Sequence, residues 1–386
     1  MLTTAGALAG AHVFKMSPAL PVLRDELSIG LVAGGWLFSL VNLVTLVLGI
    51  IAGTLSDRIG HRRVILAGVT IMGLASLAGS FAQDQLFLLM TRLAEGVGFL
   101  SVVIAAPSLI TGEAERGDRG LALGIWSAYL PAGAALVVLV APLIMDLAGW
   151  RGLWQMTAAL SVLLFVLIQR SKPRPASPHS GAVSSMAVNV VRTIARRGPW
   201  LPAIGFGLYT LQFTALMSWL PSYMVENRDL PPAFAGLLTS LVIAVNIPGC
   251  LFGGFLLKKG WRHGSLVALT SALMASMSLI IFSPAMPDMA RYLACIGLSL
   301  AGGMIPASVL GAAPLMAPSP AQIGTTNGLI VQGSNIGNVL GPPLLAAVTT
   351  IRGRWEDAIW MFMAAAALNM VLSHVLKKEE VRRETA

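Results

Sequence analysis

Charged residues are scarce in this chain. Only 11% of its 386 residues are Asp, Glu, Lys or Arg, whereas about a quarter of the residues in a soluble domain are charged. Hydrophobic residues make up 56% of the chain. This composition excludes an ordinary soluble domain and predicts a protein that crosses the membrane many times.

Cysteine and the usual catalytic patterns are also lacking. The two cysteines, Cys250 and Cys295, both lie in apolar runs and are interpreted as small packing residues, so no disulfide, metal site or cofactor is predicted. The apolar runs contain no His-x-x-x-His, Gly-x-Ser-x-Gly or paired-acid pattern for hydrolysis. A receptor would normally carry a soluble signalling domain, and no such domain is visible. An intramembrane enzyme and a non-transporting receptor are therefore disfavoured.

The hydrophobic residues are gathered into runs long enough to cross a bilayer core of roughly 30 Å. We count twelve runs, near 2–23, 31–53, 64–82, 86–110, 120–147, 152–169, 200–224, 232–257, 264–283, 290–314, 323–350 and 357–376. The first run lacks the pattern of a cleavable signal and is interpreted as a retained span. The sequence thus predicts an all-α membrane protein with twelve transmembrane helices.

One stretch in the middle interrupts this pattern. Residues 170–199 are rich in Pro, Ser and basic residues, which predicts a solvated linker, with a short amphipathic helix on the inner membrane surface as an option. Six runs precede it and six follow. The predicted organisation is a six-helix bundle at 1–169, the linker at 170–199, a second bundle at 200–376 and a tail at 377–386.

The net charge of +9 is distributed by side of the membrane. Turns after even-numbered runs, with the linker and the C-terminus, hold 18 of the 26 Lys and Arg residues, whereas the opposite turns hold six. The positive-inside rule then predicts that both termini are cytoplasmic, in a bacterial inner membrane. Because the excess is explained in this way, we expect no nucleic-acid partner.

The two halves align with each other at a shift of 200 residues. Leu20-Pro21 corresponds to Leu220-Pro221, and Gly60 to Gly260. Further matches are Gly53 with Gly253, Arg62 with Arg262, Gly133 with Gly333 and Pro142 with Pro342. So many matches at one shift indicate an internal repeat. An even number of spans in each repeat predicts parallel halves.

A charged, glycine-bracketed turn is predicted at 53–63, between the second and third runs. Its spacing is G-x-x-x-D-R-x-G-x-R-R, formed by Gly53, Asp57, Arg58, Gly60, Arg62 and Arg63. This resembles the loop signature of the major facilitator superfamily, and the resemblance extends over essentially the whole chain. It implies two six-helix bundles working by alternating access, a monomer, and a loop whose charges latch the halves together in one transport state. Leu257 replaces Asp57 in the second copy, whose latch should be weaker.

Two further stretches resemble the same family. Arg92 and Gly96 in the fourth run match its R-x-x-x-G motif. A small-residue ladder in the eleventh run predicts close helix packing; it consists of Gly333, Gly337, Gly341 and Pro342. In the fifth run only Gly133 and Pro142 remain of the equivalent ladder, which the family resemblance links to drug antiporters when it is complete.

Four ionisable side chains lie deep inside predicted spans: His12, Lys15, Arg92 and Glu95. Such groups cost about 2.5–3.5 kcal/mol each on insertion scales and usually face a cavity or a partner. For Lys15 the alternatives are binding an anionic substrate, snorkelling to the headgroups, or a salt bridge to another helix. His12 has three options, which are substrate hydrogen bonding, proton relay and plain packing.

Arg92 and Glu95 are three residues apart on one helix face. One alternative is that they neutralise each other. The other is that Arg92 contacts an anionic substrate or controls the protonation of Glu95. Glu95 is the one acid deep inside a span, so carboxylate-based proton coupling would run through it.

The resemblance implies that the first, fourth, seventh and tenth spans line a central cavity. Candidate substrate contacts on the first, fourth and seventh spans are His12, Lys15, Arg92, Tyr209 and Gln212. Trp126, Tyr129 and Asn335, on the fifth and eleventh spans, are further candidates, with helix packing or an interfacial anchor as the alternative for each. Trp219-Leu-Pro221 and Lys15-Met-Ser-Pro-Ala-Leu-Pro21 are similar to stretches of bacterial cyanate-transporter-type members.

The sequence therefore predicts a secondary active transporter that moves a small organic or inorganic anion. Protons are the predicted coupling ion, because no distinctive sodium site is visible in the sequence. The alternative is proton-driven efflux of drugs or metabolites, with Arg92 and Glu95 performing the coupling.

Overall fold

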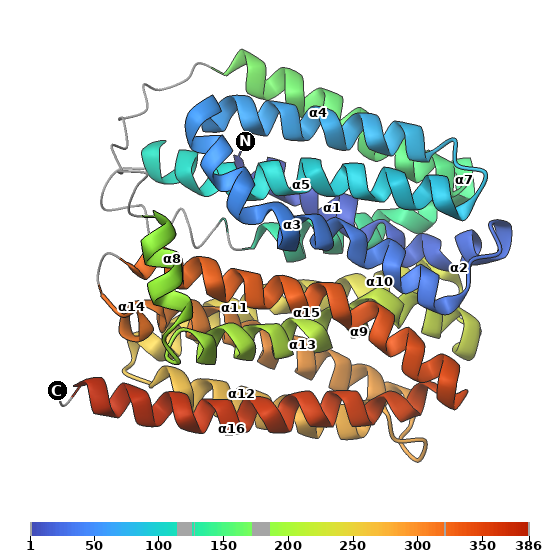
Figure 1. The fold of residues 1–386 in the computed structure, drawn as a ribbon. Coiled ribbons are helices and arrows are strands. Elements are labelled where there is room, and N and C mark those ends of the chain that lie inside the picture. The colour runs from blue at the N-terminus through green and yellow to red at the C-terminus, as the bar shows by residue number, and fades with distance from the viewer. Residues whose placement is uncertain (1, 114–125, 127, 172–185, 320–321, 385–386) are drawn as a thin grey trace. The chain divides into compact units, whose positions relative to one another are not determined.

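The computed structural model describes residues 2–113, 126, 128–171, 186–319 and 322–384. Every regular element in these ranges is a helix (Figure 1). The prediction of an all-α protein is confirmed. Two compact units are distinguished by their internal contacts: unit 1 contains 1–178 and 217–244, and unit 2 contains 179–216 and 245–386. Each unit is described by itself below.

Unit 1 begins with two short helices and four long ones. They are α1 (Leu2–Phe14), α2 (Met16–Glu26), α3 (Leu31–Ile59), α4 (His61–Gly79), α5 (Gln85–Glu113) and α7 (Tyr129–Arg170). The last of these has 42 residues, which corresponds to about 63 Å of helix, twice the thickness of a bilayer core. Gly149 interrupts it with non-helical angles (φ 63°, ψ −177°). The fifth and sixth predicted spans therefore meet at Gly149.

The second half of the chain starts with the short helix α8 (Met186–Ile194). It continues with α9 (Trp200–Arg228), α10 (Pro232–Ala244), α11 (Asn246–Lys258), α12 (His263–Ile281), α13 (Asp288–Gly311), α14 (Ala313–Met316), α15 (Ile323–Arg352), η3 (Trp355–Ala358) and α16 (Ile359–Glu384). The division between the units falls within α9 and between α10 and α11, because α10 packs on α7 of unit 1. The predicted boundaries of the bundles and the linker stay predictions.

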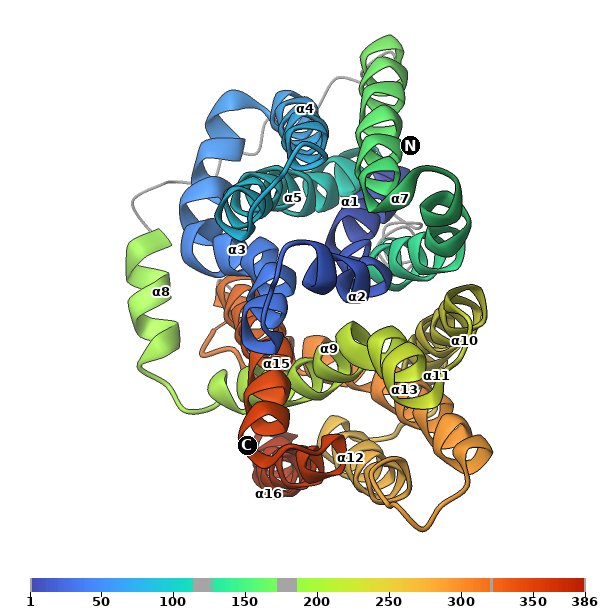
Figure 2. The ribbon, with the colours of Figure 1, turned by 90° about the vertical axis from the view of Figure 1, so that its right-hand side faces the viewer.

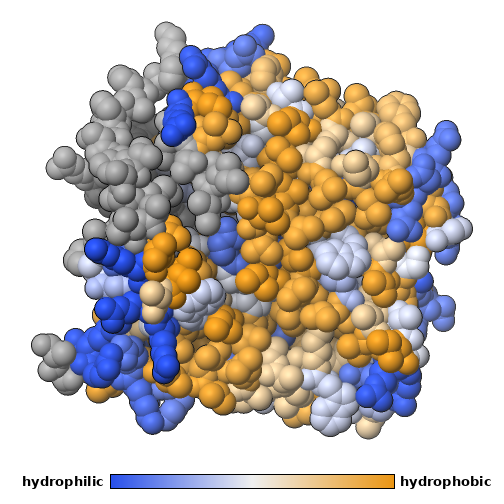
Figure 3. Space-filling view, in the orientation of Figure 1, coloured by the Kyte–Doolittle hydropathy of each residue, from blue (hydrophilic) through white to orange (hydrophobic). Residues whose placement is uncertain are grey.

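Nine segments of the described chain are long and apolar enough to cross a membrane. One of them is α7, which contains two predicted spans. The two predicted runs outside this set are 2–23 and 323–350. They are helical as well, but the first is divided between α1 and α2 and the second carries several amide and hydroxyl side chains. Figure 3 shows hydrophobic side chains over the middle of the helices of unit 2 and hydrophilic side chains toward their ends.

The backbone repeats with the sequence. Left-handed φ angles occur at Ser28 and Asp229 (52° each) and at Gly60 and Gly260 (97° and 89°), close to the shift of 200 residues. Helix neighbours repeat too: α4 packs on α5 as α12 packs on α13, and α3 on α5 as α11 on α13. Figure 2, which looks along the helices, shows the neighbours within each unit.

Proline explains both interrupted helices. A proline at position i removes the hydrogen bond to the carbonyl of residue i−4 and collides with it. Pro18 acts on Phe14, where α1 ends, and Pro248 acts on Ala244, where α10 ends. Pro18 and Pro21 predict a bend or break of the first span just beyond His12 and Lys15. The structure places the interruption there, at Lys15.

The signature turn is shorter than predicted. Helix α3 continues to Ile59 and α4 begins at His61, so Gly60 alone joins them, with φ 97°. Only glycine adopts this angle at little cost. The prediction of an open turn over 53–63 is therefore wrong in extent, because the polar residues before Gly60 extend the helix by almost two turns.

Candidate functional site

The interruption between α1 and α2 places Lys15 in the centre of unit 1. Four elements surround it: α1 carries His12, α5 carries Glu95, α4 carries Ser76 and α7 carries Thr157. We call His12, Lys15, Arg92 and Glu95 the ionic cluster. All four side chains are fully buried, with 0% exposure.

Lys15 lies 3.5 Å from His12 Nδ1 on α1, but its shorter contacts reach across the unit. Its Nζ donates to Glu95 Oε1 at 2.5 Å, to Ser76 Oγ at 2.6 Å and to Thr157 Oγ1 at 3.2 Å. It also lies 4.6 Å from the centroid of the Trp154 ring, in a cation–π contact. Of the alternatives open from the sequence, the structure shows the salt bridge to another helix.

His12 joins the same carboxylate to α7. Its Nδ1 lies 3.3 Å from Glu95 Oε1, and its Nε2 lies 3.0 Å from Ser161 Oγ. The Ser161 hydroxyl in turn lies 2.9 Å from the Thr157 carbonyl oxygen. The imidazole thus joins the cluster carboxylate to one hydroxyl of α7, and that hydroxyl donates to a backbone carbonyl. The role of His12 as a proton relay stays a prediction.

Arg92 fixes the cluster to the backbone of the neighbouring helices. Its guanidinium pairs with Glu95 Oε2 on the same helix and donates to the carbonyl oxygens of His12 (2.7 Å), Val13 (3.1 Å) and Leu37 (3.1 Å). The last carbonyls of α1 lack partners within their own helix. Arg92 satisfies two of them, so it is a structural tie as well as a charge.

The cluster carries more positive than negative charge. Lys15 and Arg92 contribute two cations and Glu95 one anion, so with a neutral His12 one positive charge is in excess. Burying charge is costly unless it is compensated. This excess is the feature that an anion entering unit 1 would compensate.

Sequence reasoning missed the polar partners of the cluster. Trp154, Thr157 and Ser161 lie on one face of α7, and Ser76 faces them from α4 with its hydroxyl 2.9 Å from that of Thr157. Their spacing of three and four residues within an apolar run was the available signal. A hydroxyl in such a run costs little to bury, so its presence alone does not indicate a functional site, whereas a buried charge does.

The other predicted contact residues fall into separate groups. Trp126 and Tyr129 stack with their ring centroids 4.6 Å apart in unit 1. In unit 2 the Tyr209 hydroxyl accepts a hydrogen bond from Asn246 Nδ2 at 2.9 Å, and Asn335 Nδ2 donates to Gln332 Oε1 at 3.3 Å.

Gln212 is a further predicted contact residue in unit 2. Its Nε2 donates to the Leu208 carbonyl at 3.1 Å. Its Oε1 is buried without a hydrogen-bond partner among the described residues. Such an acceptor is costly to bury unless something donates to it.

The predicted latch residues are partly described. Arg62 donates to the carbonyl oxygens of Ile168, Gln169 and Ser171 at 2.8–3.1 Å, at the end of α7. A cation there complements the negative end of the helix dipole. Arg58 and Arg63 are exposed. The side chain of Asp57 and the surroundings of Gly53 lie outside the described part.

The predicted ladder glycines lie where helix backbones meet. A Cβ at Gly133 would overlap the Ala7 carbonyl of α1. On α15, a Cβ at Gly333 would overlap the Ala203 carbonyl, and one at Gly337 the Gly207 carbonyl. A Cβ at Gly341 would lie 2.5 Å from the Leu211 carbonyl oxygen, and both Pro142 and Pro342 are buried.

A repeated bundle of apolar helices with a buried ionic cluster defines a multi-pass membrane protein of the transporter class. The family model described as "Major Facilitator Superfamily" matches residues 2–342. The chain belongs to the major facilitator superfamily, and it is not an enzyme.

Several relatives cover most of the chain. The "Probable sulfoacetate transporter SauU" of Cupriavidus necator is 24% identical over 379 residues, covering 92% of this chain and 86% of the relative. The "Hexuronate transporter" of Bacillus subtilis is 21% identical, covering 96% and 91%. The "3-(3-hydroxy-phenyl)propionate transporter" of Escherichia coli is 29% identical, covering 88% and 82%.

A solved structure shares the fold. It is a bacterial homologue of the human lysosomal transporter Spinster, in an inward-facing and unoccupied conformation. It superposes with a TM-score of 0.82 at 17% identity, over 98% of this chain and 96% of the other. At this identity the likeness concerns the fold alone.

Proposed function

We propose that this transporter moves a small organic anion across the bacterial inner membrane by alternating access, coupled to protons. The observation that carries the proposal is the ionic cluster of unit 1, in which Lys15 and Arg92 share the single carboxylate of Glu95. The cluster is fully buried and holds one positive charge in excess. A substrate anion that reached Lys15 would supply the missing negative charge.

The names of the full-length relatives support an organic acid as substrate. Sulfoacetate, hexuronate and 3-(3-hydroxyphenyl)propionate all carry a carboxylate, and sulfoacetate also carries a sulfonate. These three molecules differ in size and polarity, so what they share is charge. The resemblance to cyanate-transporter-type members stays a prediction beside them.

Glu95 is the proposed coupling group. In the arrangement described here Lys15 contacts Glu95 Oε1 at 2.5 Å, with His12 beside the same oxygen. An anion drawing Lys15 away would leave that oxygen with fewer donors and favour its protonation. Arg92, on the second carboxylate oxygen, and His12 would set how readily the proton arrives and leaves.

The remaining assignments follow the family resemblance. We propose Tyr209, Gln212, Trp126, Tyr129 and Asn335 as further substrate contacts. The residues of the signature, from Gly53 to Arg63, are proposed to stabilise one transport state, and the ladder glycines to hold helix pairs. Both termini would be cytoplasmic and the protein monomeric.

A thermal-shift screen of the purified protein tests the substrate class. We expect small carboxylates and sulfonates to raise the unfolding midpoint, and Lys15→Ala to abolish that rise while the unliganded midpoint stays near the wild-type value. Stabilisation by lipophilic cations alone, with no dependence on Lys15, would contradict the proposal. That outcome would favour the drug-efflux alternative, centred on Glu95.

A further inference from the structure

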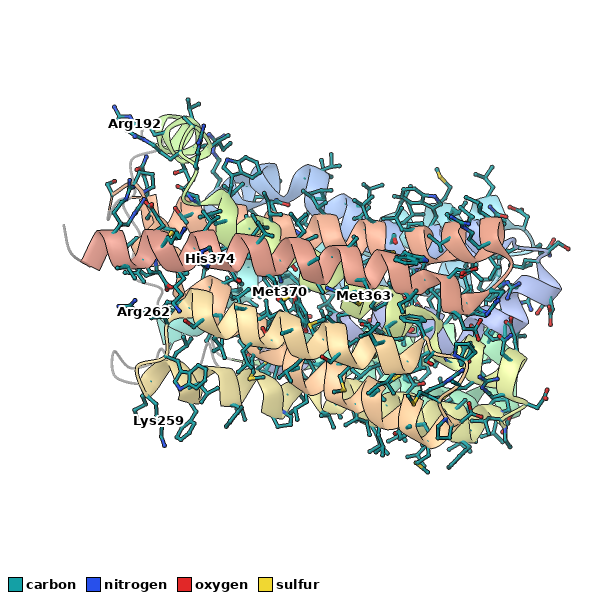
Figure 4. All side chains as sticks on the ribbon, turned by 90° about the horizontal axis from the view of Figure 1, so that it is seen from below. Arg192, Lys259, Arg262, Met363, Met370 and His374 are labelled. Atoms are coloured by element: carbon teal, nitrogen blue, oxygen red, sulfur yellow. The ribbon has the colours of Figure 1, made fainter. Side chains whose placement is uncertain are left out.

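The short helix α8 carries two apolar side chains that the described residues leave exposed. It is in contact with α15, and its residue Thr193 is buried. Val191 and Ile194, by contrast, have 68% and 47% of their surface exposed. In Figures 1, 2 and 4 α8 lies at the edge of unit 2 and runs across the direction of α9 and α16. A helix with this placement lies along a membrane surface rather than through it.

Basic residues accompany this apolar face. Arg192, Arg196 and Arg197 are all exposed. The sequence has no Asp or Glu from residue 147 to residue 225. Figure 4 places Arg192 at the same end of unit 2 as Lys259 and Arg262.

Two acids near the end of α16, Glu379 and Glu380, are already engaged, and the side chain of Glu384 lies outside the described part. Glu379 pairs with Arg382 and Arg383. The carboxylate of Glu380 accepts the backbone N–H groups of His263 and Gly264 at 3.0 Å each. The described acids nearby therefore do not compensate the three arginines of α8 and its C-terminal extension.

Trp200 connects α8 to the first membrane helix of the second half. Its Nε1 donates to the Ile194 carbonyl at 2.9 Å, which satisfies one of the carbonyls left over at the end of α8. The ring remains 37% exposed. Tryptophan with an apolar body and a satisfied N–H is typical of the membrane–water interface.

We propose that α8, with Arg196, Arg197 and Trp200, is a docking surface for the anionic phospholipid headgroups of the inner leaflet. Val191 and Ile194 enter the acyl boundary, and Arg192, Arg196 and Arg197 bind the phosphates above it. This surface is independent of the ionic cluster and of the substrate proposed for it. It would anchor the chain that connects the two halves to the bilayer.

Hydrogen–deuterium exchange of the full-length protein in lipid nanodiscs tests this proposal. The bilayers contain phosphatidylcholine alone or phosphatidylcholine mixed with phosphatidylglycerol, and the readout is the exchange of peptides covering 186–200. Since each basic residue near an anionic surface contributes about fivefold in affinity, we expect exchange to slow by about tenfold or more with phosphatidylglycerol. High salt should reverse the effect.

The triple variant Arg192→Gln, Arg196→Gln, Arg197→Gln should lose the lipid dependence. A matched control removes three arginines from the opposite turns: Arg228→Gln, Arg352→Gln, Arg354→Gln. It should keep the dependence. The exchange of α16 peptides reports whether each variant is folded. If a variant is not folded, the comparison of the wild type in the two bilayers still tests the proposal.

Three outcomes would overturn the proposal. The first is equal exchange of 186–200 in the two bilayers. The second is equal protection in detergent without lipid, because protein contacts would then hold α8. The third is protection by inorganic phosphate in pure phosphatidylcholine, because the arginines would then form a site for a soluble anion.

Discussion

Lys15 Nζ, at the interruption between α1 and α2, lies 2.5 Å from Glu95 Oε1 on α5, although the two residues are 80 positions apart in the sequence, and both side chains are fully buried. Glu95 also pairs with Arg92 on its own helix. The two cations therefore compete for one carboxylate, and they differ in what else they hold. Lys15 contacts side chains, whereas Arg92 also holds three backbone carbonyls.

This difference predicts unequal effects on stability. In Lys15→Ala the pair of Arg92 and Glu95 remains neutral, so the unfolding midpoint should fall only slightly. In Arg92→Ala the carbonyls of His12, Val13 and Leu37 no longer have a charged donor. The free energy of unfolding should therefore fall by about 3–5 kcal/mol, as it does when a buried ion pair is broken. Thermal unfolding in detergent measures both. Equal midpoints for the two variants would contradict the structural role given to Arg92.

The packing of α9 on α15 predicts that Gly337→Ala is destabilising. Its Cβ would overlap Gly207 O and Thr210 Oγ1, and because a backbone carbonyl is part of the obstacle the helices must separate. Overpacking of this kind costs about 1–3 kcal/mol. Gly324→Ala and Gly328→Ala on the same helix are the controls, because no atom lies within 4 Å of a Cβ built there. Equal unfolding midpoints for all three variants would show that the close packing at Gly337 does not contribute to stability.

The contacts of Glu26 lead us to expect a small loss of stability at acidic pH. Hydrogen bonds from Arg151 and Trp150 hold the pKa of its carboxyl below the ordinary value. Because the pKa is lower in the folded state, the ionised Glu26 stabilises the fold at neutral pH. This stabilisation is lost as the pH falls below the unfolded-state pKa of about 4.3 and then through the folded-state pKa. The side chains of Arg151 and Glu26 are 38% and 40% exposed, so the pair contributes about 0.2–1 kcal/mol. The midpoint of Glu26→Gln should vary less with pH below 5 than that of the wild type. If the unfolding midpoints of the wild type and Glu26→Gln changed in parallel with pH, Glu26 would not be the source of the acid sensitivity.

Two contacts join α2 to α9 within unit 1. Arg24 Nη1 donates to both oxygens of Glu226 at 2.8 and 2.9 Å. Ser17 Oγ lies 2.9 Å from the Met217 carbonyl oxygen, whose partner within the helix is removed by Pro221.

We expect Arg24→Glu and Glu226→Arg singly to weaken this junction and the exchanged pair to restore it. The scale is about 0.2–1 kcal/mol, that of an exposed ion pair. Protection of the α2 amides in hydrogen exchange is the measurement. A double variant no better than either single one would show that the ion pair does not hold the junction.

The sequence predicted the architecture well because the signals for it are local. Apolar runs, the 200-residue repeat and the charge asymmetry each depend on residue order alone, and the structure places a helix in the described part of each of the twelve runs, the start of the fifth (120–125 and 127) lying outside that part. Details that depend on a neighbouring helix were less accessible. The extension of α3 to Ile59 is an example, since it is the outcome of a competition between the polar residues before Gly60 and continued helix.

The candidate site shows the same limit. Sequence alone identified Lys15 and Glu95 as unusual but left the partner of Lys15 open, because Glu95 lies on another helix. The i, i+3 pair of Arg92 and Glu95 was visible, being local. Ser76 and Thr157 were overlooked, since their importance comes only from where α4 and α7 bring them.

Transport by reconstituted protein tests the central claim most directly. Proteoliposomes containing the wild type or Lys15→Ala are given radiolabelled small carboxylates and sulfonates, with and without an inward proton gradient. The account predicts gradient-stimulated accumulation by the wild type and loss of it in Lys15→Ala, with equal amounts of folded protein in both. Undiminished anion transport by Lys15→Ala would contradict it.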